Sequence, residues 1–167
     1  TMFNILGPLT NPANAKSQLI GVFSDNLLET VAKVLKNLGS RHVMAVNGSG
    51  LDEISVCSKT KVCELKNGRI EAYSINPENF GFKFRSLSEI KGGLPGENAK
   101  IILDVLSGSK GAKRDAVLLN DAAALLTSKV KDYKDALELA AYSIDSGNAL
   151  RKLKELKDFT DNAKPNN

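Results

Sequence analysis

The sequence has few of the residues that most often carry metal or acid–base chemistry. Its 167 residues include one histidine, His42, and two cysteines, Cys57 and Cys63, with no second cysteine pair. A structural zinc site needs four such ligands, so this class of site is excluded. The lone imidazole disfavours histidine-based catalysis, and its place before an apolar run predicts that it flanks a strand. We expect both cysteines to be reduced and packed in strands.

Long apolar runs and a basic arm are also missing. No stretch approaches the ~20 apolar residues that a membrane-spanning helix requires, and no signal-peptide pattern opens the sequence. We therefore expect no membrane association and a cytoplasmic location. The net charge is +4, but lysines and acids are interspersed and aromatic residues make up only 5%. This pattern indicates solvated faces of mixed charge and argues against a nucleic-acid partner.

The apolar residues that are present, 42% of the chain, predict one core or one core with a helical appendage. A short β-rich run at 17–23 precedes the segment 25–39, in which apolar residues recur every three or four positions. Ser24 or Asp25 suits the start of this helix, and Gly39 its end. A second apolar run at 42–48 completes the pattern. The sequence therefore predicts a βαβ unit with two parallel strands.

A hairpin signal and several helical patterns follow the βαβ unit. The runs 54–58, 61–65 and 69–75 read as strands, and Asn67-Gly68 between the last two is typical of a type I′ turn. The sheet is thus predicted to be mixed, and the fold class α/β with flanking helices. The predicted helices are 96–107, 112–127, 133–146 and 148–159. The final stretch TDNAKPNN has no apolar periodicity, so we expect a disordered tail.

Two adjacent carboxylates, Asp52 and Glu53, follow the second predicted strand in the stretch NGSGLDE. Ligands collect beyond the carboxyl ends of parallel strands. Neighbouring side chains of a strand point to opposite faces, so the two acids can converge on one ion only where the backbone turns, as Gly48 and Gly50 favour. Carboxylates in a turn suit Mg²⁺, which completes its coordination with water and phosphate. From these residues alone, solvated side chains or a helix start remain alternative interpretations.

A second glycine-rich stretch contains Gly92, Gly93 and Gly96 ahead of a predicted helix. These glycines are compatible with an anion bound at the helix N-terminus, and equally with a loop that needs flexibility. The sequence leaves both interpretations open.

Five segments carry a family resemblance, in a constant order and spacing from Thr1 to about Phe159. TMFNILGPLTNP is similar to the segment R-T-x-F-N-x-L-G-P-L-T-N-P of the anthranilate phosphoribosyltransferases. GSGLDEIS resembles the G-x-D-E metal segment of that family, and GGLPGENA resembles its G-G-x-P-x-E-N-A. KRDAVLLNDAAAL resembles its R-D-A-V-L-L-N segment, and IDSGNALRKL its C-terminal helix.

The resemblance implies the large domain of a nucleoside phosphorylase or phosphoribosyltransferase-type fold and a reaction between anthranilate and phosphoribosyl pyrophosphate. It implies that Asp52 and Glu53 bind Mg²⁺, partly through water, and that Gly7 and Pro8 line the anthranilate entrance. Four more residues match the first segment, and for them we expect capping and turn formation beside a hinge: Asn4, Thr10, Asn11 and Pro12.

Similar enzymes carry further parts ahead of this region: a small helical domain, a G-T-G-G-D pyrophosphate loop, a K-H-G-N segment and an anthranilate-contacting arginine. None occurs in these 167 residues. We therefore expect the C-terminal half of a longer enzyme, inactive alone and a homodimer when full length. Residues 1–16 would be the entry segment from the missing helical domain, 17–160 an incomplete α/β domain, and 161–167 the tail.

Two other functions stay open at this point. Pyrimidine nucleoside phosphorylases resemble the same family in fold, although the GPLTNP segment argues against them. A noncatalytic α/β module or subunit is the second alternative, favoured for the chain alone by the missing pyrophosphate loop.

Overall fold

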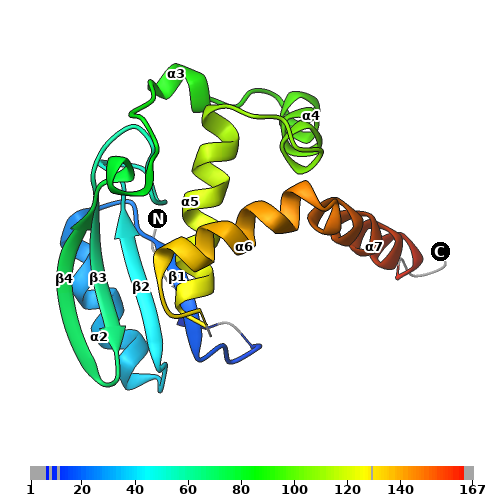
Figure 1. Ribbon diagram of the computed structural model, residues 1–167. Coiled ribbons are helices and arrows are strands. Elements are labelled where there is room, and N and C mark those ends of the chain that lie inside the picture. The colour runs from blue at the N-terminus through cyan, green and yellow to red at the C-terminus, as the bar shows by residue number, and fades with distance from the viewer. Residues whose placement is uncertain (1–6, 8, 11, 129, 164–167) are drawn as a thin grey trace.

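In the computed structural model, residues 7, 9–10, 12–128 and 130–163 are described, and they form a mixed sheet with helices on both faces (Figure 1). The elements are, in chain order, β1 (Ser17–Gly21), the 3-10 helix η1 (Asp25–Leu27), α2 (Leu28–Asn37), β2 (His42–Asn47), β3 (Thr60–Lys66), β4 (Arg69–Ile75), the 3-10 helix η2 (Pro77–Phe80), α3 (Leu87–Ile90), α4 (Pro95–Leu106), α5 (Ala112–Leu126), α6 (Tyr133–Asp145) and α7 (Asn148–Asn162).

The predicted βαβ unit is confirmed. β1 and β2 pair in parallel, and α2 connects them. The apolar spacing of α2 places four side chains on one buried stripe: Leu28, Val31, Ala32 and Leu35. The helix stops where the sequence predicted, because Gly39 adopts φ +84° and the next N–H, of Ser40, donates to the Leu35 carbonyl at 2.9 Å.

The middle of β2, residues 43–46, is apolar because both faces of the strand are buried there. Val43 and Ala45 belong to the core between the sheet and α2, whereas Met44 and Val46 belong to the core between the sheet and α5. This alternation is what a strand in the middle of a three-layer arrangement requires. Figure 1 shows α2 on one face of the sheet and α5 on the other.

The predicted hairpin is also confirmed. β3 and β4 are antiparallel, and Asn67 and Gly68 adopt φ +51° and +77° in the turn between them. These are the signs that a type I′ turn requires. β3 in turn pairs antiparallel with β2, so the sheet is mixed, in the order β1-β2-β3-β4.

The helices after the sheet follow the predicted ranges within a few residues. α5 covers the sheet, and a third apolar cluster joins it to α4 and α6 through Val105, Leu118, Ala140 and Ile144. α7 has no buried residue and extends away from the sheet (Figure 1). None of the helices in the described ranges is long and apolar enough to cross a bilayer.

One strand prediction was wrong, and the described part of the expected tail is ordered. The segment 54–58 is irregular, so Cys57 lies in a loop and only Cys63 lies in a strand. Its backbone groups are satisfied by side chains instead of a neighbouring strand: the N–H of Ser55 donates to Thr60 Oγ1, and that of Cys57 to Ser55 Oγ, both at 2.9 Å. The tail is helical as far as Asn162, because α7 continues beyond the last apolar residue of its stripe. Residues 164–167 and 1–6 lie outside the described residues.

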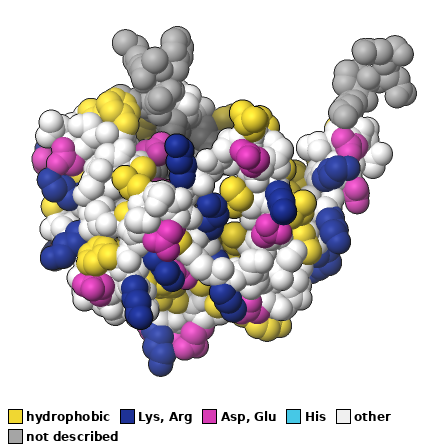
Figure 2. All heavy atoms as spheres, turned by 90° about the horizontal axis from the view of Figure 1, so that it is seen from above, with side chains coloured by type: hydrophobic (Ala, Val, Ile, Leu, Met, Phe, Trp, Pro, Cys, Tyr) yellow, Lys and Arg dark blue, Asp and Glu magenta, His cyan; other side chains and the backbone are white. Residues whose placement is uncertain are grey.

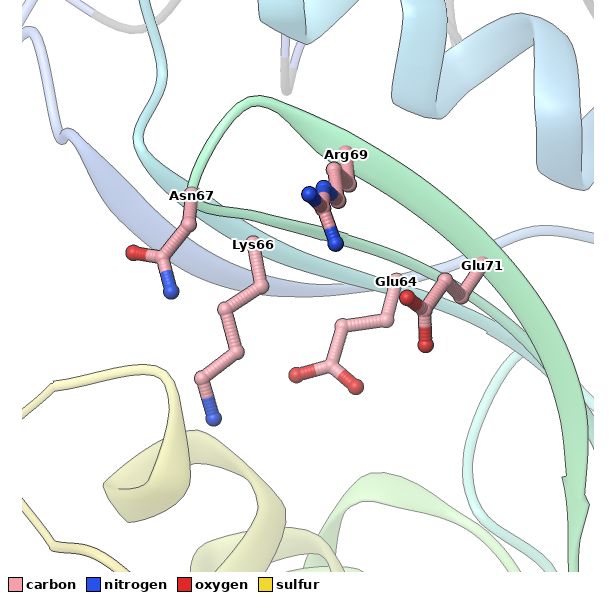
Figure 3. Close-up of a pocket in the computed structure, with 5 residues that line it drawn as sticks. All are labelled: Glu64, Lys66, Asn67, Arg69 and Glu71. Atoms are coloured by element: carbon pink, nitrogen blue, oxygen red, sulfur yellow. The ribbon is translucent and has the colours of Figure 1, made fainter.

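The hairpin carries a charged surface at the end of the sheet where β2 begins. Figure 3 shows the five residues that line a cavity of about 360 Å³ there: Glu64, Lys66, Asn67, Arg69 and Glu71. Glu64 and Glu71 lie directly opposite each other on β3 and β4, and like charges in this position repel. Glu64 is stabilised by two other partners, His42 Nε2 at 2.6 Å and the Tyr73 hydroxyl at 2.9 Å.

This arrangement predicts different roles for the two glutamates. Glu64→Ala removes the partner of the partly buried His42 ring and of the Tyr73 hydroxyl, so the free energy of unfolding should fall by about 1–3 kcal/mol. Glu71→Ala removes only an exposed like charge and should change it by less than about 0.5 kcal/mol. Urea denaturation of both variants is the measurement. Equal losses would contradict the pairing.

Candidate functional site

The loop that contains Asp52 and Glu53 begins where β2 ends, as predicted. This is the upper end of the sheet in Figure 1, and Figure 2 shows the molecule from that side. Its first four residues form a closed turn, in which the N–H of Gly48 donates to the Leu51 carbonyl at 2.8 Å. Ser49 and Gly50 at its centre adopt φ +56° and +97°. Two successive positive φ angles define a tight primed turn, so the loop has little freedom to change its course.

Close backbone packing fixes the loop against the end of β1. An ideal Cβ at Gly21 would lie 1.6 Å from the carbonyl oxygen of Asp52, and one at Gly48 would lie 2.6 Å from the Ser55 Cβ. No side chain fits at either position without displacing the backbone. Because Gly21 has no side chain, the Asp52 backbone can lie directly against the carboxyl end of β1.

Asn47, the last residue of β2, connects the loop to the segment that follows β1 by hydrogen bonds of its side chain. Its side chain is buried, with the residue 4% exposed. The Nδ2 donates to the Val22 carbonyl at 2.7 Å, and the Oδ1 accepts from the N–H of Gly50 at 3.2 Å. A buried amide with both ends satisfied joins the segment after β1 to the turn after β2.

Asn120, on α5, holds the other end of the loop. Its Oδ1 accepts from the N–H of Ile54 at 2.9 Å, and its Nδ2 donates to the carbonyl of the same residue at 2.8 Å. The amide thus pairs with both backbone groups of Ile54, a fully buried residue that directly follows Glu53. Sequence analysis missed this role. The available signal was a polar residue in an otherwise apolar stretch of the KRDAVLLND segment.

A further contact secures the segment beyond the loop. The N–H of Arg85 donates to the carbonyl of Val56 at 3.0 Å, and the Arg85 side chain pairs with Asp115 on α5 through Nη2 at 2.7 Å and Nε at 3.1 Å. The Asp115 carboxylate also raises the pKa of the Arg85 guanidinium, chiefly through these hydrogen bonds. Residues 54–56 are therefore anchored to α5 at two places.

The electrostatics at the two carboxylates favour a cation. Asp52 is exposed and Glu53 is half-buried. Burial raises the pKa of the Glu53 carboxyl, and the negative charge of Asp52 raises it further. A cation beside both would relieve this repulsion. Within the described part of the chain, no group of three or more histidine, cysteine or acidic residues could hold a metal ion. The pair fits Mg²⁺, whose remaining ligands are usually water and substrate oxygens.

The residues expected at the anthranilate entrance are only partly described. Gly7 is exposed, and a Cβ built on it would meet no atom within 4 Å, so the space beside it is open. The N–H and hydroxyl of Thr10 both donate to the Gly7 carbonyl, at 3.2 and 3.4 Å, in agreement with the turn role predicted for Thr10. Pro8, Asn4 and Asn11 lie outside the described residues.

Of the two interpretations of Gly92, Gly93 and Gly96, the structure favours the loop over the anion cradle. The N–H of Gly93 donates to Asn98 Oδ1 and that of Leu94 to Glu97 Oε2, both at 2.8 Å. These side chains of α4 occupy two of the backbone donors at the start of the helix, which leaves fewer for an anion. An ideal Cβ at Gly93 would lie 1.9 Å from the Glu97 carboxylate, so this glycine makes room for the cap.

The face of the molecule at this end of the sheet carries both positive and negative side chains. In Figure 2, lysine and arginine side chains alternate with acidic ones across the face. This distribution on the face shown agrees with the mixed-charge surface inferred from the sequence.

The contact between Asn120 and Ile54 gives a test of how the loop is held. Asn120→Ala leaves two buried backbone groups of Ile54 unpaired, so the free energy of unfolding should fall by about 1–3 kcal/mol and the Ile54 amide should exchange faster. Asp158→Asn, at an exposed position of α7, should change stability by less than about 0.5 kcal/mol. Hydrogen exchange at Ile54 is the deciding readout. Unchanged protection in Asn120→Ala would show that the loop is held by something else.

Comparison with known proteins places this geometry among phosphoribosyltransferases. The chain is 52% identical over 168 aligned positions to an anthranilate phosphoribosyltransferase of Methanococcoides burtonii, covering 100% of this chain and 48% of that protein. It is 49% identical to the enzyme of the same name from Methanobrevibacter smithii, covering 96% of this chain and 48% of that protein. The chain therefore spans about half the length of the curated relatives it matches.

Solved structures show the same likeness. The crystal structure of anthranilate phosphoribosyltransferase from Thermus thermophilus superposes with a TM-score of 0.84 at 38% identity, over 93% of this chain and 46% of that one. The Saccharomyces cerevisiae enzyme in complex with PRPP and Mg gives 0.81 at 34% identity, over 92% and 45%. The family model described as the a/b domain of a glycosyl transferase family matches residues 1–150. The chain belongs to this glycosyl transferase family.

Proposed function

We propose that this chain provides the metal-binding end of the α/β domain of an anthranilate phosphoribosyltransferase. The complete enzyme would join anthranilate to phosphoribosyl pyrophosphate and release pyrophosphate, a step of tryptophan biosynthesis. The observation that carries the proposal is the Asp52–Glu53 pair on a rigid turn at the carboxyl end of β2. Its support is the similarity to transferases of this name, one of them bound to PRPP and Mg.

In this proposal Asp52 and Glu53 hold Mg²⁺ beside the pyrophosphate. The bound ion would stabilise the charge that develops on the leaving pyrophosphate. Asn47 and Asn120 keep the two carboxylates in place before substrate arrives, so little ordering of the loop is needed on binding. Gly7 and Pro8 would line the anthranilate entrance, where the open space beside Gly7 leaves room for a planar ring.

This chemistry agrees with the shortage of histidine. The amino nitrogen of anthranilate attacks the anomeric carbon of the ribose, and the bond to the pyrophosphate oxygen breaks with its electron pair leaving on the pyrophosphate. The main requirements are a stabilised leaving group and a positioned nucleophile. The lone imidazole, His42, is engaged with Glu64 at the opposite end of β2, which supports a reaction that does not use it.

The proposal includes partners and a location that rest on the family resemblance. The other half of the enzyme would supply the pyrophosphate loop, the complete protein would be a homodimer, and the location would be cytoplasmic. A pyrimidine nucleoside phosphorylase is the alternative with the same fold. A phosphorolysis assay with thymidine or uridine distinguishes the two, since the transferase has no phosphate-dependent cleavage of either nucleoside.

The first prediction of the proposal is that the 167-residue chain alone does not turn over. It has no glycine-rich loop to hold pyrophosphate by backbone amides. Anthranilate fluorescence should therefore stay constant after phosphoribosyl pyrophosphate and Mg²⁺ are added. Steady consumption of anthranilate by the homogeneous chain would refute the assignment of the missing parts.

The second prediction separates metal binding from folding. In a full-length enzyme containing this chain, Asp52→Asn with Glu53→Gln removes the charges that attract Mg²⁺, so kcat/KM should fall by at least about tenfold and activity should need more Mg²⁺. Activity is measured against Mg²⁺ concentration, with Asp158→Asn as a control of the same chemical change at an exposed site of α7. Mg²⁺ curves that superimpose would refute the metal assignment.

The same substitutions should not destabilise the chain. Because the folded-state pKa of Glu53 is raised above its ordinary value of 4.5, ionised Glu53 opposes folding at pH values above that pKa. Without Mg²⁺, Glu53→Gln should therefore keep or raise the Tm at pH 7, and any gain should disappear below pH 4.5. A lower Tm at pH 7 would indicate a structural cap in place of a metal ligand.

A further inference from the structure

The start of α5 is a helix N-terminus whose backbone donors have no partner in the described part of the chain. The N–H groups of its first three residues, Ala112, Lys113 and Arg114, meet no acceptor there, and the preceding Gly111 has no side chain to cap them. The first N–H groups of a helix cannot be satisfied within the helix itself. Together with the helix dipole, these free donors attract negative charge.

A cavity of about 220 Å³ lies at this end of the helix. A Cβ built on Gly111 would meet no atom within 4 Å, so the space beside the first turn is open. Pockets that enclose drug-sized ligands have ~300–1,000 Å³, so this cavity suits a group of a few atoms. Its charged lining residues are three basic and two acidic ones: Lys110, Lys113, Arg114, Glu89 and Asp104.

One of these acids is already engaged at another helix start. Glu89 accepts from the N–H of Ser86 at 2.8 Å through its carboxylate, where it caps α3. The charge balance of the cavity lining is therefore positive.

Arg114 distinguishes this cavity from an exposed helix end. The residue is 3% exposed, and its Nη2 lies 2.9 Å from the Asp145 carboxylate at the end of α6. Its Nη1 is buried too, and it has no hydrogen-bond partner among the residues that the structure describes. The guanidinium group is always charged in proteins, and a buried donor without an acceptor is costly. This nitrogen therefore calls for an acceptor from outside the chain.

The guanidinium group lies beside the loop that precedes α5. Helical side chains lean toward the N-terminus of their helix, and Arg114 is the third residue of α5. The Asp145 carboxylate agrees with this direction, because it also lies 3.6 Å from Lys110 Nζ and 3.9 Å from a Cβ built on Gly108. The unpaired nitrogen and the free N–H groups are thus at the same end of the helix.

We propose that this cavity binds a phosphate oxyanion, held by the first N–H groups of α5 together with Arg114 and Lys110. The surplus of donors favours an oxyanion over water, because a phosphate group offers at least three strong acceptor oxygens. Lys113 adds to the surplus, since its ammonium group has three donors and only two are engaged, with the carbonyls of Glu89 and Lys91.

The proposed site is separate from the two carboxylates. None of the residues that line the cavity belongs to the loop of Asp52 and Glu53. The inference therefore goes beyond the proposed function and does not rest on it.

Amide chemical shifts of the isotope-labelled 167-residue chain test the site directly. Inorganic phosphate is added in metal-free buffer, with sodium chloride of equal ionic strength as the reference. The amides of Ala112, Lys113 and Arg114 should shift along saturating curves with one Kd, while those of Asp52 and Glu53 stay in place. A parallel titration uses glycerol 3-phosphate. Tighter binding of this ester identifies a phosphate ester as the ligand, and binding no tighter identifies the free ion.

Two variants with a matched control assign the binding to side chains. Lys110→Gln removes an exposed charge, and Arg114→Lys removes the unpaired nitrogen but keeps a positive charge beside Asp145. Each should raise Kd for phosphate by at least about fivefold, because a charged donor is lost. Lys154→Gln, the same change as Lys110→Gln at an exposed site of α7, should leave Kd as it is. Circular dichroism checks that each variant folds. If Arg114→Lys does not fold, Lys110→Gln and the wild-type shifts decide the question.

Three results of the titration would overturn the inference: amides at 112–114 that do not move, shifts that rise without saturation, or saturating shifts only elsewhere in the chain. A cavity that holds water alone gives the first of these. The inference also fails if every folded variant of Lys110 and Arg114 binds phosphate as the wild type does. None of these readouts involves Mg²⁺ or anthranilate, so a failure of the proposed function leaves them unchanged.

Discussion

The structure around the carboxylates depends on one contact, the paired hydrogen bonds between the Asn120 amide and the backbone of Ile54. Ile54 is fully buried and belongs to no strand, so its N–H and C=O have no ladder to join. Without Asn120 the chain leaving Glu53 would carry two unpaired polar groups into the core between the sheet and α5. This requirement links the helix to the loop and sets the place where the carboxylate segment ends.

The start of the same loop is held by different means. Asn47 bonds to Val22 and Gly50, and the glycine at 21 lets the Asp52 backbone lie against β1. The two acids are therefore placed on a rigid frame although burial and mutual repulsion both oppose the ionised form of Glu53. A loop free to relax would separate the charges. Under the proposed function, a bound cation would recover this cost in stability.

The two edges of the sheet differ in composition. β4 ends the sheet with charged and exposed residues, whereas β1, at the other edge among the described strands, carries no charged residue and lies beside the loop of Asp52 and Glu53. The helices show a similar contrast, since α5 is buried against the sheet and α7 has no buried residue. The well-packed half of the molecule is the half that frames Asp52 and Glu53.

The sequence by itself determined the elements whose signals are local. Apolar periodicity predicted α2 and the buried β2, Asn67-Gly68 predicted the hairpin, and the order strand, glycine turn, acid pair predicted where the carboxylates lie. Tertiary structure alone decided the contacts between distant segments. Asn120 meets Ile54 across 66 positions, and its role cannot be read from the neighbours of either residue. The irregular course of 54–58 and the capped amides at Gly93 and Leu94 have the same cause. In each, hydrogen-bond partners depend on which groups the fold brings together, and local composition does not specify them.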